Sequence, residues 1–381
     1  MIELPDVSWN KMMSEIEELD SVSNRIRTLI LNGWENLSEL MEENWPYLAQ
    51  EQKHPWIGDW YNKAPWVKAY YGHIGHQLKA LELQANFSSL LERLKSPDVT
   101  TSYGAQAEIN AAWKLKRSRI PFEFVDPSQR GKSFDSSATV DRMEVGIEVS
   151  TFAQSQKFKI QMDIFQKIAS SLMMCSMKGA AAAGQLHRML SRTRAMHIIG
   201  MIREGLKDAL KYDKEIFIEE ADAFEFCIVP KSKVATLQKW KQKRNLGEST
   251  QLSAPNFNTS TGNRLHSKIL RKCKQIPHDM PGVIYLEGVP VYIMDTEPEI
   301  MMDFKLADIE EAVYENTNLL FASLNRFTLG WKGSRRIVKK DVRYVRVNRY
   351  GLLEDVSMIV SNRYHRYPHL RHKKLINAFS T

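Results

Sequence analysis

Three acidic residues have the type and spacing needed to hold a divalent metal ion. Glu108 lies in a segment expected to be helical, and Asp135 and Glu148 lie in two segments expected to be strands. In residues 145–149 the apolar side chains point to one face of the strand, which leaves Glu148 on the other face. If the two strands form a hairpin, Asp135 lies beside Glu148. Two neighbouring carboxylates repel each other, and Mg²⁺ or Mn²⁺ would stabilise the pair, activate a water molecule and stabilise charge on a phosphate.

A simpler interpretation of the same three residues stays open, namely that they are ordinary surface carboxylates of a hairpin and a helix.

Other candidate sites are weaker. His365, His369 and His372 are interrupted by Pro368 and have no nearby cysteine or carboxylate to complete a zinc site, so surface or phosphate-contacting roles are expected. His73 and His76 are expected to be core or polar-face residues. The small residues of segment 178–185 lack the ending of a phosphate-binding P-loop and are expected to let helices pack closely against a sheet.

The surrounding pattern predicts an α/β (α+β) protein with a helical module at residues 1–98 and a mixed domain at 99–381. Apolar residues recur every three or four positions from residue 8 to about 95, as in amphipathic helices. Helices are then expected at 103–117, 161–190 and 195–210. Strands are expected at 122–125, 133–140, 145–149, 224–229, 289–294, 342–347 and 356–360. A lysine-rich insertion is expected at about 231–280.

Aromatic residues are concentrated in the helical module, which holds six of the nine tryptophans. Such residues can stack on bases or anchor a partner, and in a small helical domain they more often fill the core or an interface between domains. A core role is therefore the first expectation, and docking of a protein partner is the alternative.

Charge is distributed unevenly along the 381 residues, whose formal net charge is +8. Residues 1–50 hold ten acids and three bases, whereas residues 331–381 hold three acids and thirteen bases. A second basic block, residues 225–280, has eleven bases and three acids. Two basic regions favour binding of a polyanion such as nucleic acid, although solvated basic surfaces are also common.

The three cysteines are far apart and odd in number, so neither a disulfide framework nor a cysteine-rich zinc site is expected. Because no segment resembles a signal peptide or a membrane span, a cytoplasmic protein without a membrane partner is expected. The sequence leaves the oligomeric state open, and a homo-oligomer is compatible with it.

The order of these segments resembles the PD-(D/E)XK nuclease superfamily. A helix with a glutamate, a strand, a strand with an aspartate and then an apolar strand with a glutamate follow in the order of its αβββαβ core. Residues 132–135, ending in Phe134 and Asp135, are similar to the Pro-Asp motif of the family, with Phe134 where proline is commonest. Residues 148–150 are similar to its Glu-X-Lys motif, except that Ser150 replaces the lysine. Glu108 matches the helix glutamate that many members place at the metal site.

The resemblance implies a restriction-endonuclease-like core, with a mixed central sheet flanked by helices. It also implies a Mg²⁺-dependent or Mn²⁺-dependent nuclease acting on DNA, with genome defence or DNA processing as the expected setting. It implies that Asp135, Glu148 and the Val149 carbonyl bind the metal, and that Glu108 binds a second ion or orients water. A neutral Ser150 cannot act as the family's cation. Either the cation comes from the following helix, as Lys157, Lys159 or Lys167, or the protein is a degenerate nuclease fold that binds nucleic acid or scaffolds a complex. A third interpretation is a protein that binds only other proteins.

Overall fold

The computed structural model describes residues 7–125, 134–152, 156–248, 250–253, 261–289, 306–329 and 334–380. It divides the chain into two compact units. The first contains residues 1–153 and 262–381, and the second, residues 154–261, is inserted between them. The helical module expected at 1–98 is therefore part of the larger unit and does not separate from the rest at residue 98. Among the residues that the structure describes, no helix is both long and apolar enough to cross a membrane.

The first unit begins with six helices that form the expected helical module. Ser8 and Ser23 cap the first two helices, since their hydroxyl groups accept hydrogen bonds from the amides of Lys11 and Ile26. The bounds of the six helices are α1 (Trp9–Glu17), α2 (Asn24–Met41), α3 (Trp45–Glu51), α4 (Ile57–Trp60), α5 (Pro65–Leu81) and α6 (Phe87–Leu94).

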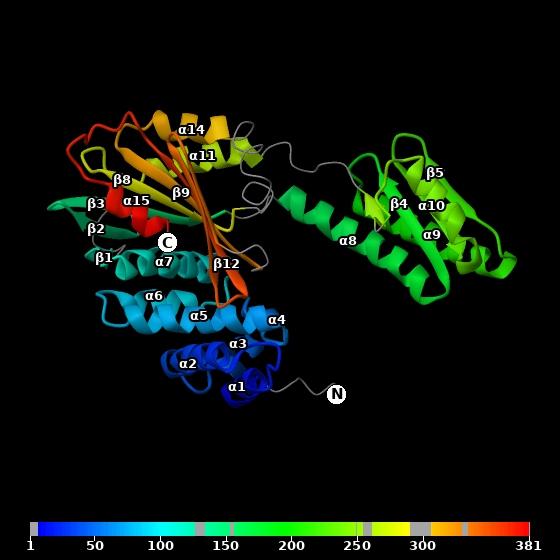
Figure 1. Cartoon of the computed structure of the whole chain (residues 1–381), viewed down its shortest axis with the longest axis horizontal. Coiled ribbons are helices and arrows are strands. Elements are labelled where there is room, and N and C mark those ends of the chain that lie inside the picture. Colours follow the sequence, from blue (N-terminus) through cyan, green and yellow to red (C-terminus); the bar gives the residue numbers. More distant parts are fainter. Residues whose placement is uncertain are drawn as a thin grey trace. The chain divides into compact units, whose positions relative to one another are not determined.

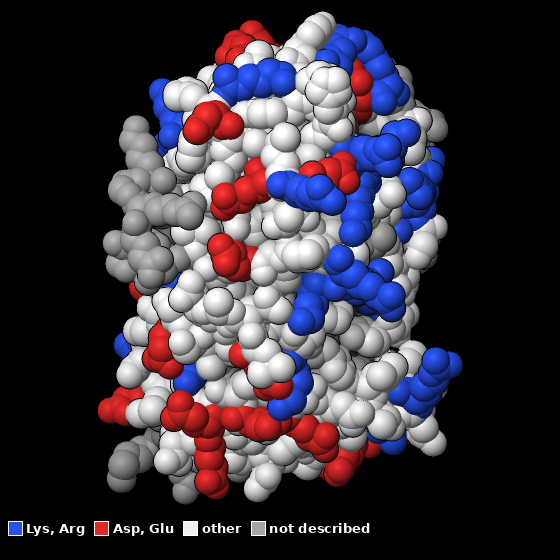
Figure 2. Space-filling model, turned by 90° about the vertical axis from the view of Figure 1, so that its left-hand side faces the viewer, with Lys and Arg blue, Asp and Glu red and all other residues white. Residues whose placement is uncertain are grey.

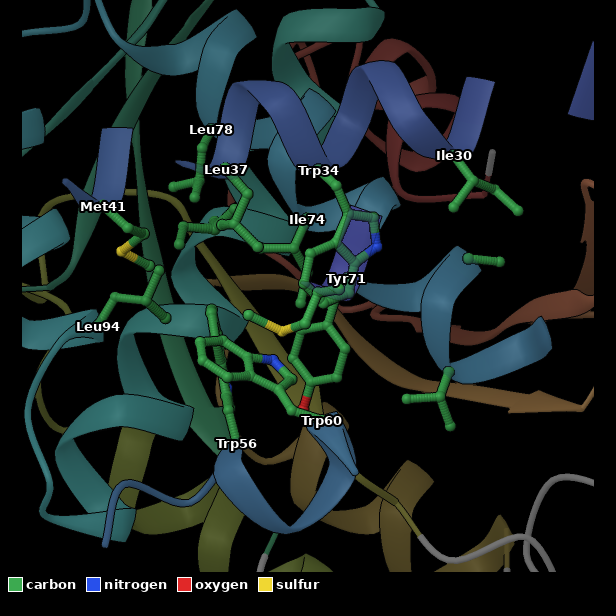
Figure 3. Packing of buried hydrophobic residues seen from close by; sticks show 14 of the residues in the cluster. Ile30, Trp34, Leu37, Met41, Trp56, Trp60, Tyr71, Ile74, Leu78 and Leu94 are labelled. Atoms are coloured by element: carbon green, nitrogen blue, oxygen red, sulfur yellow. The ribbon is translucent and has the colours of Figure 1, made fainter. Parts of the chain in front are cut away.

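Tryptophans fill the core of this module, as Figure 3 shows for Trp34, Trp56 and Trp60 around Tyr71. Five of the six module tryptophans are buried, and Trp66 is the one that is partly exposed. Most neighbouring rings meet edge to face or tilted, for example Trp56 and Tyr71 at a centroid distance of 5.1 Å, whereas Trp9 and Trp45 are stacked. The expectation of a core role is confirmed for these five tryptophans.

Glycines allow α2 and α5 to approach each other closely. A Cβ atom built on Gly33 would lie 2.0 Å from the carbonyl oxygen of Gly72, and one on Gly75 would lie 1.8 Å from that of Gly33. No larger residue fits at these positions without moving a helix backbone. This contact holds α5 in place, and α5 in turn packs against the helix that carries Glu108.

An eight-stranded mixed sheet forms the centre of the first unit, in the order β1-β2-β3-β8-β9-β12-β11-β10. Strands β3, β8 and β9 are parallel to one another, and the other neighbours are antiparallel. The strands are β1 (Phe122–Phe124), β2 (Ser136–Val140), β3 (Met143–Thr151), β8 (Gly282–Glu287), β9 (Leu319–Leu329), β10 (Arg335–Lys339), β11 (Val342–Arg349) and β12 (Leu353–Ser361).

Helices cover both faces of this sheet (Figure 1). Helices α11 (Thr261–Cys273) and α14 (Leu306–Tyr314) contribute to the apolar core on one face, and α7 (Val99–Arg117) and α15 (Lys373–Phe379) to that on the other. The helical module packs on the outer side of α7. The protein is therefore of mixed α/β type, with a mixed sheet flanked by helices, as the sequence predicts.

The second unit has a four-stranded sheet in the order β5-β6-β4-β7. The residues of α8 and α9 pack on one face and those of α10 on the other. Its elements are α8 (Gln156–Met177), β4 (Ala180–Leu186), α9 (Arg192–Tyr212), β5 (Ile216–Glu220), β6 (Phe224–Pro230), η1 (Lys231–Lys233), α10 (Val234–Gln242) and β7 (Leu252–Ser253).

Three expectations about elements need correction or stay untested. The helix expected at 161–190 is wrong beyond Met177, because Gly179 adopts a positive φ and the small residues after it form the buried strand β4. The insertion expected at about 231–280 combines parts of two units, since α11 from Gly262 onward belongs to the first. Most of the strand expected at 289–294 lies outside the described residues, and β8 ends just before it at Glu287.

Candidate active site

The β2–β3 hairpin brings Asp135 and Glu148 together as the sequence predicts. Ser136 pairs with Ile147, so Asp135, one position earlier, falls opposite Glu148 in the antiparallel register. The Asp135 amide donates to the Ile147 carbonyl at 3.1 Å, and the Asp135 Oδ2 atom accepts from the Val149 amide at 2.7 Å. The two carboxyl groups lie close enough for the charge of Asp135 to raise the pKa of Glu148. The two strands therefore position both groups at one point.

Burial makes ionisation of these two carboxyl groups unfavourable. The Glu148 side chain is 2% exposed, and burial followed by the nearby charge of Asp135 raises its pKa to about 8. Burial also raises the pKa of Asp135, although the Val149 amide and the cations Lys272 and Arg93 lower it in part. Without a bound cation, ionisation of Glu148 is therefore less favourable in the folded protein than in water.

Glu108 lies next to this pair on α7 and is held by an arginine of the helical module. The two guanidinium nitrogens of Arg93, on α6, donate to the two Glu108 carboxylate oxygens at 2.6 Å each. Burial raises the pKa of Glu108 to about 7, the Arg93 hydrogen bonds lower it, and the charge of Asp135 raises it. The helical module thus contributes a charged residue to the site, which the sequence analysis did not predict.

A lysine that the sequence analysis also missed lies against Glu148. Lys272, in the last turn of α11, donates from its Nζ atom to Glu148 Oε1 and, at 2.7 Å, to Gln275 Oε1. Its side chain is 18% exposed. One signal was available in the sequence, because residues 264–272 combine buried apolar positions at helical spacing with bases four residues apart. Arg93 had no comparable signal.

The described contacts do not place the lysines that the resemblance implies next to Glu148. The side chains of Lys157 and Lys159 lie outside the described residues. Lys167 lies on α8 in the second unit, where its Nζ atom pairs with Asp163 at 2.8 Å, one helical turn away. Lys272 is therefore the lysine that the structure pairs with Glu148.

The donor set fits a hard divalent cation. Glu148 Oε2 is buried and has no hydrogen-bond partner among the described residues, which is an unusual condition for a carboxylate oxygen. The Val149 carbonyl points to the same edge of β3 as its amide, because both groups of a strand residue point to one side, and that amide bonds to Asp135. Asp135, Glu148 and the Val149 carbonyl thus offer only oxygen ligands, the type that Mg²⁺ and Mn²⁺ prefer.

The carboxylate of Glu108 does not form a compact set of three metal ligands with those of Asp135 and Glu148. In the described part of the chain, one trio of His, Cys, Asp or Glu has ligand atoms that all lie within 4.8 Å of one another, and it is His266 with Glu311 and Glu315. This second cluster joins α11 to the end of α14, and both of its glutamates are exposed. Glu108, held by Arg93, therefore lies beside the pair and is not part of one compact set of ligand atoms with it.

His73, His365 and His372 pack against neighbouring rings or form hydrogen bonds with neighbouring residues. His73, on α5, is buried against Trp113 and Tyr350, and its Nδ1 atom lies 3.2 Å from the Tyr350 hydroxyl. His365 Nδ1 accepts from the Tyr367 amide at 3.2 Å, and the His365 and His372 rings meet edge to face.

A scan of protein-family models and searches of curated proteins and of solved structures find no match to this chain.

Proposed function

We propose that this protein is a divalent-metal-dependent nuclease that hydrolyses phosphodiester bonds of DNA. The observation that carries the proposal is the convergence of Asp135, Glu148 and Lys272 at one buried point, with Glu108 beside them. Asp135, Glu148 and the Val149 carbonyl would hold Mg²⁺ or Mn²⁺, which when bound supplies Lewis-acid activation of water and phosphate. The Lys272 ammonium is placed to neutralise charge developing on a phosphate oxygen.

The order of elements supports the resemblance to the PD-(D/E)XK superfamily. Helix α7 with Glu108, strands β1 to β3 with Asp135 and Glu148, helix α11 and the parallel strand β8 follow the αβββαβ order. The second unit is inserted between β3 and α11, which separates Lys272 from Glu148 by 124 positions. The proposal thus assigns the role of the family's strand lysine to a helix lysine on the other side of the insertion.

Charge also supports a polyanionic substrate. The inserted unit, residues 154–261, contains 17 lysines and arginines and 10 aspartates and glutamates, so it carries most of the net charge of the chain. On the face of the molecule in Figure 2, acidic side chains gather at the lower end, where the helical module lies, and lysines and arginines gather along the upper right side. Nucleic acid would be attracted to the basic regions and repelled by the acidic helices.

Cleavage of DNA tests the proposal directly. Supercoiled and linear DNA are incubated with the full-length protein in Mg²⁺, Mn²⁺ or EDTA, and nicking is followed by gel electrophoresis. Glu148→Gln and Lys272→Met are each expected to lower cleavage at least 100-fold. Lys274→Met, an exposed lysine two residues beyond Lys272, is the matched control and is expected to cleave normally. Metal-independent cleavage, or full activity of Glu148→Gln, would contradict the proposal.

A second candidate function, a non-catalytic nucleic-acid-binding or scaffold protein, is favoured by one observation. The Lys272 ammonium already bonds to Glu148 and neutralises part of the charge that a metal would neutralise. A protein that has lost catalysis can use such an internal ion pair to stabilise its remaining carboxylates. Salt-sensitive DNA binding without cleavage in any metal would support this function.

A further inference from the structure

Helix α11 carries a line of cations that extends away from the carboxylate pair. Arg264, Lys268 and Lys272 follow one another at intervals of four residues, so their side chains lie on one stripe of the helix. The buried residues Leu265, Ile269 and Cys273, each one position later, form the stripe that packs on the sheet. We define the α11 row as Arg264, Lys268 and Lys272.

The axial spacing of the α11 row matches the spacing of alternate residues along β3. At one end Lys272 bonds to Glu148, and at the other end the Arg264 guanidinium lies over the Phe152 ring, 4.9 Å from its centroid. Four helical residues rise about 6 Å, and two strand residues rise about 6.6 Å, so the two elements keep nearly the same period. Lys268 therefore falls at the level of Ser150.

Neighbouring cations crowd Lys268, the middle residue of the row. Burial and then the charges of Arg271, Lys272 and Arg264 lower the pKa of Lys268 to about 8, whereas Glu148 raises it. Cations crowded on one partly buried stripe favour an anion placed between them and solvent. An extended polyanion with regularly spaced charges matches a row with one cation per helical turn.

We propose that the α11 row binds consecutive phosphates of one nucleic-acid strand, with Lys272 at the phosphate nearest Asp135 and Glu148. Lys268 and Arg264 then hold the phosphates that lead away from the carboxylates along β3. The identity of the phosphate next to the carboxylates rests on the proposed nuclease function, whereas binding of the strand by Lys268 and Arg264 does not. Ser150, small and neutral, leaves the space at its level to the lysine of α11.

Binding without cleavage tests the row separately from catalysis. Anisotropy of a fluorescein-labelled 30-base-pair duplex is measured in EDTA with the full-length protein over a series of KCl concentrations. Lys268→Gln and Arg264→Gln are each expected to weaken binding and to reduce the slope of log K against log salt by about 0.9, the value for one lost phosphate contact. Lys274→Gln, outside the row, is expected to leave the slope unchanged.

Each outcome decides the proposal. Unchanged slopes for both row variants would overturn it, whatever the cleavage assay shows, and reduced slopes in a chain without nuclease activity would still support it. Displacement of the duplex by millimolar inorganic phosphate at constant ionic strength would indicate a single-anion site and would also overturn the row. The melting temperature checks folding, and Lys268→Gln is expected to leave it equal or higher because crowding of cations is relieved.

Discussion

Glu148→Gln is expected to make the metal-free protein more stable at alkaline pH. The substitution preserves the shape of the side chain and removes its ionisation. In the folded protein the pKa of Glu148 is raised to about 8, mainly by burial and by Asp135, whereas in an unfolded chain it is about 4.3. Between these two values the folded protein keeps a proton that the unfolded chain has lost.

The sign and size of the effect follow from this difference. Because the folded state binds more protons, the free energy of unfolding of the wild type falls by about 1.4 kcal/mol for each pH unit between 4.3 and 8. The total loss is about 5 kcal/mol, and glutamine does not undergo it. The variant and the wild type should therefore be similar at pH 5, and the variant should be several kcal/mol more stable at pH 8.5.

Thermal unfolding followed by tryptophan fluorescence measures this difference in EDTA. At roughly 2 °C per kcal/mol for a domain of this size, the variant should melt roughly 8 to 10 °C above the wild type at pH 8.5. Addition of 10 mM MgCl₂ at that pH should raise the melting temperature of the wild type and leave that of the variant unchanged. Parallel pH profiles of the two proteins would refute the reasoning, since they would mean that Glu148 is not the titrating group.

Three further outcomes are expected. Arg93→Ala should destabilise the protein by about 2 kcal/mol at pH 8, measured by urea unfolding, because Glu108 loses its bidentate partner, and by less at pH 6, where Glu108 can protonate. Gly33→Ala should cost about 3 kcal/mol because its Cβ meets the Gly72 carbonyl, whereas Gly58→Ala, with nothing within 4 Å, should be neutral or slightly stabilising. Mg²⁺ affinity, measured by calorimetry, should rise between pH 6 and 9, because Glu148 must lose its proton to bind a cation; a flat profile would contradict the raised pKa of Glu148.

The sequence predicts the carboxylates well because their positions depend on local rules. Alternation along residues 143–151 decides which face Glu148 occupies, and the short connection between β2 and β3 fixes its neighbour Asp135. The partners of these residues depend on tertiary packing. In the sequence, Lys272 follows the inserted unit and Arg93 belongs to the helical module. No local sequence pattern therefore connects these two residues to the site.

Composition misleads where small residues are concentrated. The run of alanines at residues 180–183 has high helix propensity, and the chain nevertheless forms β4 there, since the strand lies between β6 and β7 and its residues are largely buried. A cross-strand contact explains the glycine that follows. A Cβ on Gly184 would lie 2.1 Å from the Phe226 ring, so the ring occupies the space of a side chain.

The free energy needed to bury the carboxylates of Glu148 and Asp135 favours a bound cation over a purely structural role for these two residues. Glu148 holds a buried oxygen without a hydrogen-bond partner among the described residues, next to Asp135 and within the field of Glu108. A structural site would be more stable with glutamine or an apolar residue at this position, because no charge would then be buried. The ammonium of Lys272 compensates only one side of Glu148, since it bonds to Oε1 and leaves Oε2 unpaired. A divalent cation shared with Asp135 is the ligand that would satisfy the remaining oxygen and remove the repulsion between the two carboxylates.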